Sequence, residues 1–126
     1  MGLTIKEVSE KYGISADTLR YYEKVGVIPP VTRTPGGIRD YGESDISWVE
    51  QAKCMRTAGL SIECLIEYQK LYSKGDETFQ ARLDLLSEQR SLLLAQKQQL
   101  EETLNRLNYK IAKYEEAVRT GKLIWD

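Results

Sequence analysis

Residues Ile14 to Gly26 read I-S-A-D-T-L-R-Y-Y-E-K-V-G and predict a short helix with a polar surface. Ser15 is a good N-cap, because its hydroxyl can accept a hydrogen bond from a backbone N–H of the first turn. Gly26 suits the position after the last turn, since glycine enters the left-handed conformation without steric cost. Leu19 is the main apolar anchor, and most other side chains are hydroxyls or ions.

The residues just before this helix predict another short helix, over residues 4–12. Thr4 and Glu7 have the spacing of a capping box, which favours a helix start. Two short helices joined by a glycine turn form a helix-turn-helix, whose second helix enters the major groove of DNA. The alternative is an ordinary helical hairpin in which Tyr21 and Tyr22 are core residues.

The residues after Gly26 predict a small basic hairpin. Pro29 and Pro30 stop the helix, and the Gly36-Gly37 pair is a signal for a two-residue hairpin turn. Arg33 and Arg39 then lie on opposite arms of the hairpin. The order helix, turn, helix, basic hairpin is that of a winged helix-turn-helix.

These motifs together resemble the MerR family of bacterial transcriptional regulators. The similarity rests on I-S-A-D-T-L-R-Y-Y-E-K-V-G-V-I, then R-x-x-x-G-x-R-x-Y, then A-G-L-S-I, and it covers residues 3 to about 118. The resemblance implies a homodimer that binds a near-palindromic, double-stranded promoter with an overlong spacer. It also implies that the dimer distorts this spacer when a signal arrives, and so reaches RNA polymerase only through the DNA.

We predict that DNA contacts come from the second helix, the wing and the third helix. The net charge of −1 and the pI of about 5.6 are unusual for a nucleic-acid binder. Binding must therefore depend on a local basic face rather than on total charge. The predicted DNA-binding residues are Ser15, Asp17, Thr18, Arg20, Tyr21, Tyr22, Lys24, Arg33, Arg39, Tyr41, Lys53 and Arg56.

Two more helices are expected before the next break in the chain. Ser44 is the expected N-cap of a third helix that ends at Gly59, and Ser61 the N-cap of a fourth that runs to about Tyr72. Residues 73–76 then interrupt the pattern, with Asp76 as the expected cap of the following helix. We place a domain boundary there.

Residues 79–118 predict one long helix with a coiled-coil seam. Apolar residues recur at alternating steps of four and three, which is the heptad pattern. Arg90 and Lys97 are charged exceptions within the seam. The sequence thus predicts a dimer, and only the resemblance implies that its helices are antiparallel. The predicted dimerisation residues are Leu83, Leu86, Leu93, Leu100, Leu104, Leu107, Ile111 and Tyr114.

The residue types present argue against catalysis and against metal sensing. The chain has no histidine and only two cysteines, so we expect no catalytic residues, no cofactor and no enzyme activity. Metal-sensing members of the family have thiolates near the start and just past the end of the long helix. Residues 76–80 and 120–126 contain no cysteine or histidine, so no metal site is expected. Residues 121–126 are too few to form a drug-binding domain, so no such domain is expected.

Cys54 is the candidate redox or electrophile sensor. It lies between Lys53 and Arg56, and nearby cations favour the nucleophilic thiolate. The alternative for Cys54, and more so for Cys64, is a packing role only. A cysteine in the third helix, without metal site or ligand domain, resembles the family's small branch linked to aldehyde and thiol stress.

The expected fold is mainly all-α: a winged helix-turn-helix DNA-binding domain (residues 1–75), a long dimerisation coiled-coil helix (76–119) and a short tail (120–126). No signal peptide or membrane span is apparent, so a cytoplasmic location without membrane contact is expected. The sequence leaves two alternative functions. One is a coiled-coil interaction module or adaptor whose helix-turn-helix contacts protein; the other is a DNA-compacting protein, which would need a more basic chain.

Overall fold

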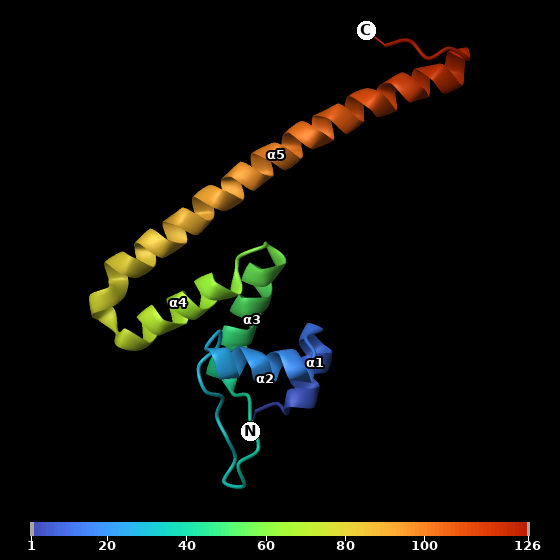
Figure 1. Cartoon of the computed structure of the whole chain (residues 1–126). Coiled ribbons are helices and arrows are strands. Elements are labelled where there is room, and N and C mark those ends of the chain that lie inside the picture. The colour runs from blue at the N-terminus through green and yellow to red at the C-terminus, as the bar shows by residue number, and fades with distance from the viewer. Residues whose placement is uncertain (1, 126) are drawn as a thin grey trace. The chain divides into compact units, whose positions relative to one another are not determined.

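The computed structural model describes residues 2–125, and it is mainly helical (Figure 1). Its elements in chain order are α1 (Ile5–Tyr12), α2 (Ala16–Val25), α3 (Glu43–Thr57), α4 (Ile62–Lys74), the 3-10 helix η1 (Asp76–Thr78) and α5 (Phe79–Thr120). Within the described residues, β-structure is limited to isolated bridges. The predicted mainly all-α fold with a long C-terminal helix is confirmed.

The caps of the first two helices form as predicted. Thr4 N donates to Glu7 Oε1 at 2.9 Å, and Glu7 N donates to Thr4 Oγ1 at 3.1 Å, which completes the capping box. Ser15 Oγ accepts from the N–H of Thr18 at 3.1 Å. Gly26, with φ of 92°, ends α2 in the left-handed conformation.

The predicted start and end of the third helix are wrong by one or two residues. Gly42, not Ser44, is the N-cap of α3, because the Asp45 carboxylate accepts the Gly42 N–H at 2.9 Å. A carboxylate three residues after the N-cap can bind the N-cap N–H, and this fixes the start of the helix. Ala58 is the C-cap, so the helix ends just before Gly59. The Ser61 cap of α4 is confirmed by its bond from Cys64 N at 3.1 Å.

The turn before α5 also differs from the prediction. Asp76 does not cap α5: it begins η1, and no side chain caps this short helix. Gly75, with φ of 96°, turns the chain between α4 and η1. The long helix α5 then continues to Thr120, two residues past the predicted end.

The wing has a three-residue loop rather than the predicted two-residue one. Thr34 N donates to Ile38 O at 2.8 Å, and Gly37 N donates to Thr34 O at 2.9 Å, so residues 35–37 form the loop. Gly37 has a φ of 86°, which suits the last position of such a loop. The arms pair through a bridge between Arg33 and Arg39.

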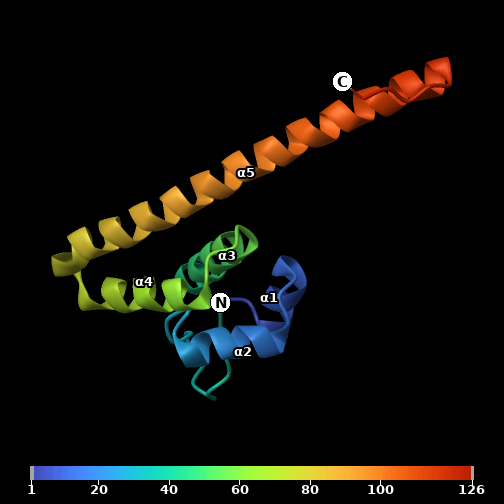
Figure 2. The same cartoon turned by 45° about the horizontal axis from the view of Figure 1, so that its top comes forward.

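The chain divides into two units, one reaching to Ser87 and the other beginning at Glu88. The core of the first unit joins α1, α2, α3, α4 and the loop between α2 and α3, which Figure 2 shows gathered together. Its buried residues are Val8, Leu19, Tyr22, Val27, Ile28, Val31, Tyr41, Val49, Ala52 and Leu65. The first turns of α5 thus belong to the first unit, beyond the expected boundary after residue 75.

In the second unit, the tail folds back against its own helix. The Trp125 ring lies 5.8 Å from the Tyr114 ring in an edge-to-face arrangement, and 6.2 Å from the Tyr109 ring. None of the helices formed by the described residues is long and apolar enough to cross a bilayer.

Candidate nucleic-acid interface

The outer surface of α2 carries several of the residues predicted to reach DNA. Asp17, Arg20, Tyr21 and Lys24 are exposed. Arg20 Nη1 lies 3.0 Å from Asp17 Oδ1 in a solvent-exposed ion pair. Such exposed pairs contribute little to stability, so Arg20 can exchange this carboxylate for a phosphate at small cost.

The inner surface of α2 is apolar and fixes the helix to the core. Leu19 is fully buried and Tyr22 is 8% exposed. The two adjacent tyrosines therefore have different roles, because Tyr21 is 49% exposed and faces solvent. We retain Tyr21 as a candidate DNA contact and assign the Tyr22 side chain to the core.

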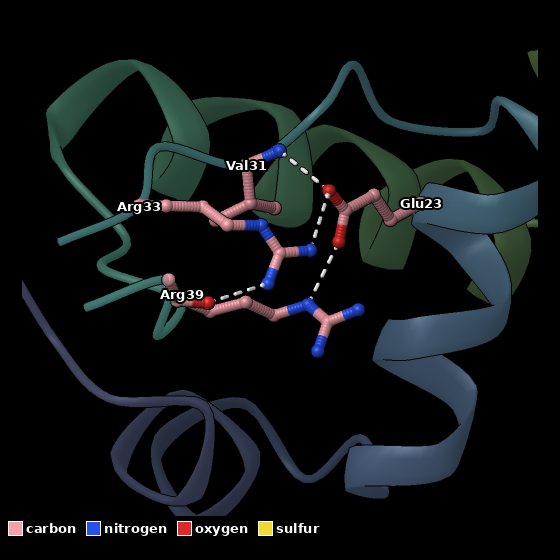
Figure 3. Close-up of polar contacts among 5 residues, drawn as sticks. Glu23, Val31, Arg33 and Arg39 are labelled. Atoms are coloured by element: carbon pink, nitrogen blue, oxygen red, sulfur yellow. Dashed lines mark hydrogen bonds and ion pairs between the residues drawn. The ribbon is translucent and has the colours of Figure 1, made fainter. Parts of the chain in front are cut away.

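Glu23 joins α2 to the wing and is the central residue of this surface (Figure 3). Its Oε1 accepts from Arg39 Nε at 2.7 Å, and its Oε2 accepts from the backbone N–H of Val31 at 2.8 Å. Arg33 Nη2 lies 3.6 Å from the same Oε2. We call these four residues, Glu23, Val31, Arg33 and Arg39, the Glu23 cluster.

The Glu23 cluster favours the ionised carboxylate. Burial alone would raise the pKa of Glu23, but the hydrogen bond from Val31 N–H and the bond and charge of Arg39 outweigh it, with a further contribution from Arg33. The pKa of Glu23 is therefore lowered from its usual value. One negative charge thus holds two wing arginines beside the recognition helix.

The wing arginines differ in how much of each remains exposed. The Arg39 side chain is 22% exposed and that of Arg33 is 43% exposed. Arg33 Nη1 also donates to the Gly37 carbonyl at 3.1 Å, across the wing. The wing is therefore held by its own arginines before any DNA arrives, which lowers the entropy cost of binding.

Tyr41, another predicted DNA contact, is a core residue. It is 1% exposed, and it pairs with Leu3 through backbone bonds of 2.9 and 2.8 Å. Its hydroxyl is buried with no hydrogen-bond partner among the described residues. Burial raises the pKa of the Tyr41 hydroxyl, so it stays protonated. We assign Tyr41 to positioning the wing rather than to touching DNA.

The third-helix candidates are not joined to this surface by any contact found within residues 2–125. Arg56 Nη1 donates to the Leu60 carbonyl at 2.6 Å, which directs it to the end of its own helix. Lys53 and Cys54 line an open hollow of about 340 Å³ together with Tyr12, Glu50 and Thr57. The structure therefore gathers the α2 and wing residues and leaves Lys53 and Arg56 apart from the Glu23 cluster.

Glu23 is the residue that sequence reasoning missed. It stands in the quoted helix, but an acidic residue there gave no reason to expect a role in DNA binding. The useful signal was the presence of two arginines in the following hairpin with no assigned carboxylate partner.

A short two-helix unit with an exposed polar second helix and an attached basic wing defines a winged helix-turn-helix DNA-binding protein. Comparison with known proteins agrees. The family model described as MerR family regulatory protein matches residues 4–41. The chain is 54% identical over 92 residues to the HTH-type transcriptional regulator AdhR of Bacillus subtilis, a match that covers 73% of this chain and 66% of AdhR.

Two solved structures match over almost the whole chain. A protein from Listeria monocytogenes assigned as a MerR family transcriptional regulator superposes with a TM-score of 0.89 at 45% identity, over 95% of this chain and 91% of that one. HiNmlR, a MerR family regulator lacking the sensor domain and bound to promoter DNA, gives a TM-score of 0.86 at 33% identity, over 98% of each chain. This chain belongs to the MerR family: it is a transcriptional regulator and not an enzyme.

Proposed function

We propose that the protein is a homodimer that binds a near-palindromic promoter and switches transcription by distorting the spacer DNA. The observation that carries this proposal is the Glu23 cluster, which holds the basic wing beside the exposed surface of α2. A protein-binding adaptor has no need of cations on both a helix and a wing. HiNmlR, which matches almost the whole chain, was crystallised bound to promoter DNA.

In this proposal each part of the surface has its own task. Arg20, Lys24, Arg33 and Arg39 bind phosphates and set the position of the protein on the duplex. Asp17 and Thr18, near the N-terminus of α2, come closest to base edges, as the N-terminal residues of a recognition helix do. Ser15 caps the helix, and Tyr21 packs against the sugar-phosphate backbone.

Dimerisation is supported by the apolar stripe of α5. Leu100, Leu104, Leu107 and Ile111 are each more than half exposed in the single chain. A continuous stripe of this kind is costly in water and is usually covered by a partner. Paired α5 helices would cover this apolar stripe along the seam. They would also bring together two DNA-binding units, each of which binds one half of the near-palindromic site.

The two charged seam residues favour antiparallel helices. In a parallel pair, Arg90 and Lys97 would each face the same residue of the second chain, and like charges would meet inside the seam. In an antiparallel pair in which the midpoints of the two seams coincide, Arg90 faces Leu107 and Lys97 faces Leu100 of the second chain. The long arginine and lysine stems can then cover leucine while their charges reach water.

Distortion of the spacer would let one bound dimer either repress or activate. Bending a site of this size costs a few kcal/mol, so a modest bias can select the bent state. RNA polymerase would respond to the shape of the DNA and need not touch the protein.

Footprinting on the DNA upstream of its own gene, followed by transcription from that promoter in vitro, tests this function. We expect a symmetric footprint across the spacer and hypersensitive sites at its centre. Absence of any footprint at protein concentrations that give dimers would contradict promoter binding and favour the adaptor.

We also propose Cys54 as the residue that receives the signal, with an aldehyde or another electrophile as effector. Cys54 is exposed in the hollow beside Lys53, whereas Cys64 is buried. An adduct on α3 would lie next to the helices that carry the DNA-reading surface.

Promoter-driven transcription with and without formaldehyde tests Cys54. Cys54→Ser should abolish the response, while the matched variant Cys64→Ser should retain it. A full response in Cys54→Ser would show that the thiol is not the sensor, and the tail residues Leu123–Trp125 would then become the next candidates.

A further inference from the structure

The corner between α4 and α5 is closed by hydrogen bonds that replace those lost at the end of α4. The last carbonyls of a helix have no partner within it. Gly75 N donates to the Tyr72 carbonyl at 3.1 Å, and the Thr78 hydroxyl lies 2.6 Å from the Leu71 carbonyl. Thr78 is only 8% exposed, so its hydroxyl depends on these protein partners.

Arg82, one turn into α5, completes this corner. Its Nε donates to Thr78 Oγ1 at 2.9 Å, and its Nη2 donates to the Gly75 carbonyl at 2.7 Å. Its guanidinium lies 4.8 Å from the centre of the Phe79 ring and 5.2 Å from that of Tyr72. Arg82 forms no ion pair with any carboxylate of the described residues. The guanidinium of Arg82 thus connects α5 to Thr78 of η1, to Gly75 and to Tyr72 of α4.

The aromatic contacts extend from this corner to α3. Trp48 packs edge-to-face on Tyr72, with ring centres 5.1 Å apart, and lies 6.1 Å from Tyr68. Trp48 also packs against the core of the DNA-binding unit. A continuous series of contacts therefore leads from the core through Trp48 and Tyr72 to Arg82.

We propose that Arg82 is a positioning residue for DNA distortion: it fixes the direction in which α5 leaves the DNA-binding unit. This inference rests on the proposed function, in which two paired α5 helices connect the DNA-binding units of the two protomers. If the corner is rigid, the distance between the two DNA-binding units of the dimer is fixed, and the dimer discriminates between spacers of different length. If the corner is loosened, each DNA-binding unit can change its position, and that discrimination is lost.

The guanidinium suits this task in a way that lysine does not. Its planar guanidinium donates in two fixed directions while it lies close to two aromatic rings, whereas an ammonium is a single point charge. Arg82→Lys should therefore behave much like Arg82→Ala at the corner. Thr78→Val, which keeps the shape of the side chain and removes the hydroxyl, should weaken the same corner.

Hydrogen exchange tests the corner independently of DNA. In Arg82→Ala, amides of η1 and of the first turn of α5, including Thr78 N, should exchange faster, while those of α2 stay unchanged. Arg106→Ala is the matched control, because Arg106 is exposed on the same helix and lies outside the heptad seam. Sedimentation should show that every variant remains a dimer.

The second part of the experiment measures the affinity of each variant for the footprinted promoter duplex. The duplex is used with its own spacer and with spacers one base pair longer or shorter. We expect Arg82→Ala to reduce the affinity ratio between the native and altered spacers by about fivefold, a coupling change typical of residues that contact neither ligand. Arg106→Ala should keep the parent ratio. Arg82→Ala combined with Thr78→Val should do no more than either change alone, because both act at one corner.

An unchanged spacer ratio in Arg82→Ala overturns the inference, whether or not exchange at the corner is faster. A changed ratio with unchanged exchange also overturns it, because Arg82 would then act through DNA or the second chain. If the parent protein binds none of the duplexes, the proposed function itself is overturned. The titration of the parent protein alone therefore separates failure of the proposed function from failure of the inference about Arg82.

Discussion

Arg39 Nε donates to Glu23 Oε1 at 2.7 Å, and this bond joins the wing to the recognition helix. The two residues lie sixteen positions apart in the chain, so the bond fixes one DNA-contacting element against another. Because Glu23 also accepts the Val31 N–H, its carboxylate holds the strand that enters the wing as well. Loss of this carboxylate should affect both stability and DNA binding.

Glu23→Gln should lower the free energy of unfolding by about 1–2 kcal/mol, since hydrogen bonds to a charged group are replaced by neutral ones. Urea denaturation followed by circular dichroism measures the change. Glu67→Gln, an exposed change on α4, is a suitable control and should have almost no effect. Equal stability of Glu23→Gln and the parent would mean that the cluster contributes nothing to the fold.

The stability difference between the parent and Glu23→Gln should depend on pH. The pKa of Glu23 is lower in the folded chain, so the carboxylate stabilises the fold fully at pH values above its unfolded pKa. That contribution is lost as the pH falls through the folded-state pKa. The difference in free energy of unfolding between the two proteins should therefore shrink as the pH falls below the unfolded pKa of Glu23. A constant difference over this range would contradict the assignment.

Much of this fold could be predicted from the sequence because local signals agreed with one another. The capping box at Thr4 and the Ser15 cap each act within a few residues, and both are present in the structure. The unbroken helical pattern after Phe79 likewise forms one helix, α5. The predicted start of α3 was wrong, because the Asp45 carboxylate accepts the Gly42 N–H and Gly42 takes the N-cap position in competition with Ser44. Such competition depends on backbone geometry that spacing alone does not determine.

The candidate site was less predictable, because it depends on pairings across the chain. Tyr21 and Tyr22 look alike in the sequence, yet one is exposed and the other buried. Tyr41 follows the basic wing and could be taken for a DNA contact, but its bridge to Leu3 places it in the core. Glu23 bonds to Val31 and Arg39, which follow it by 8 and 16 positions and come close to it only in the folded chain.

Arg20→Ala and Arg39→Ala should weaken binding to specific and scrambled duplexes alike. Both side chains are proposed to bind phosphates, so each loss should also reduce the salt dependence of log K by about one unit of slope. Titrations at several salt concentrations measure this, with Arg106→Ala as control. Arg20→Ala is the more direct test, since Arg39 also holds the wing. Unchanged affinity for both duplexes in both variants would exclude this surface.

Leu100→Glu combined with Leu107→Glu should give monomers that lose promoter binding. Both leucines lie in the seam of α5, and a buried carboxylate in each chain would oppose pairing. Leu92→Glu is a matched control, because Leu92 is 54% exposed but lies outside the heptad seam. Analytical ultracentrifugation distinguishes the two states. An intact dimer in the double variant would contradict the proposed interface.

Tyr41→Phe should leave DNA affinity unchanged and should leave stability unchanged or raise it by up to about 1 kcal/mol. The Tyr41 hydroxyl is buried without a partner among the described residues, and an unpaired buried hydroxyl costs free energy that phenylalanine avoids. The ring itself stays in the core, so the packing beside Leu3 and the wing is preserved. Urea denaturation and duplex titration on the same protein measure both effects.

A weaker complex with unchanged stability would return Tyr41 to the set of DNA-contacting residues. A loss of more than about 1 kcal/mol in stability would instead indicate that the hydroxyl has a hydrogen-bonding partner in solution, such as an ordered water.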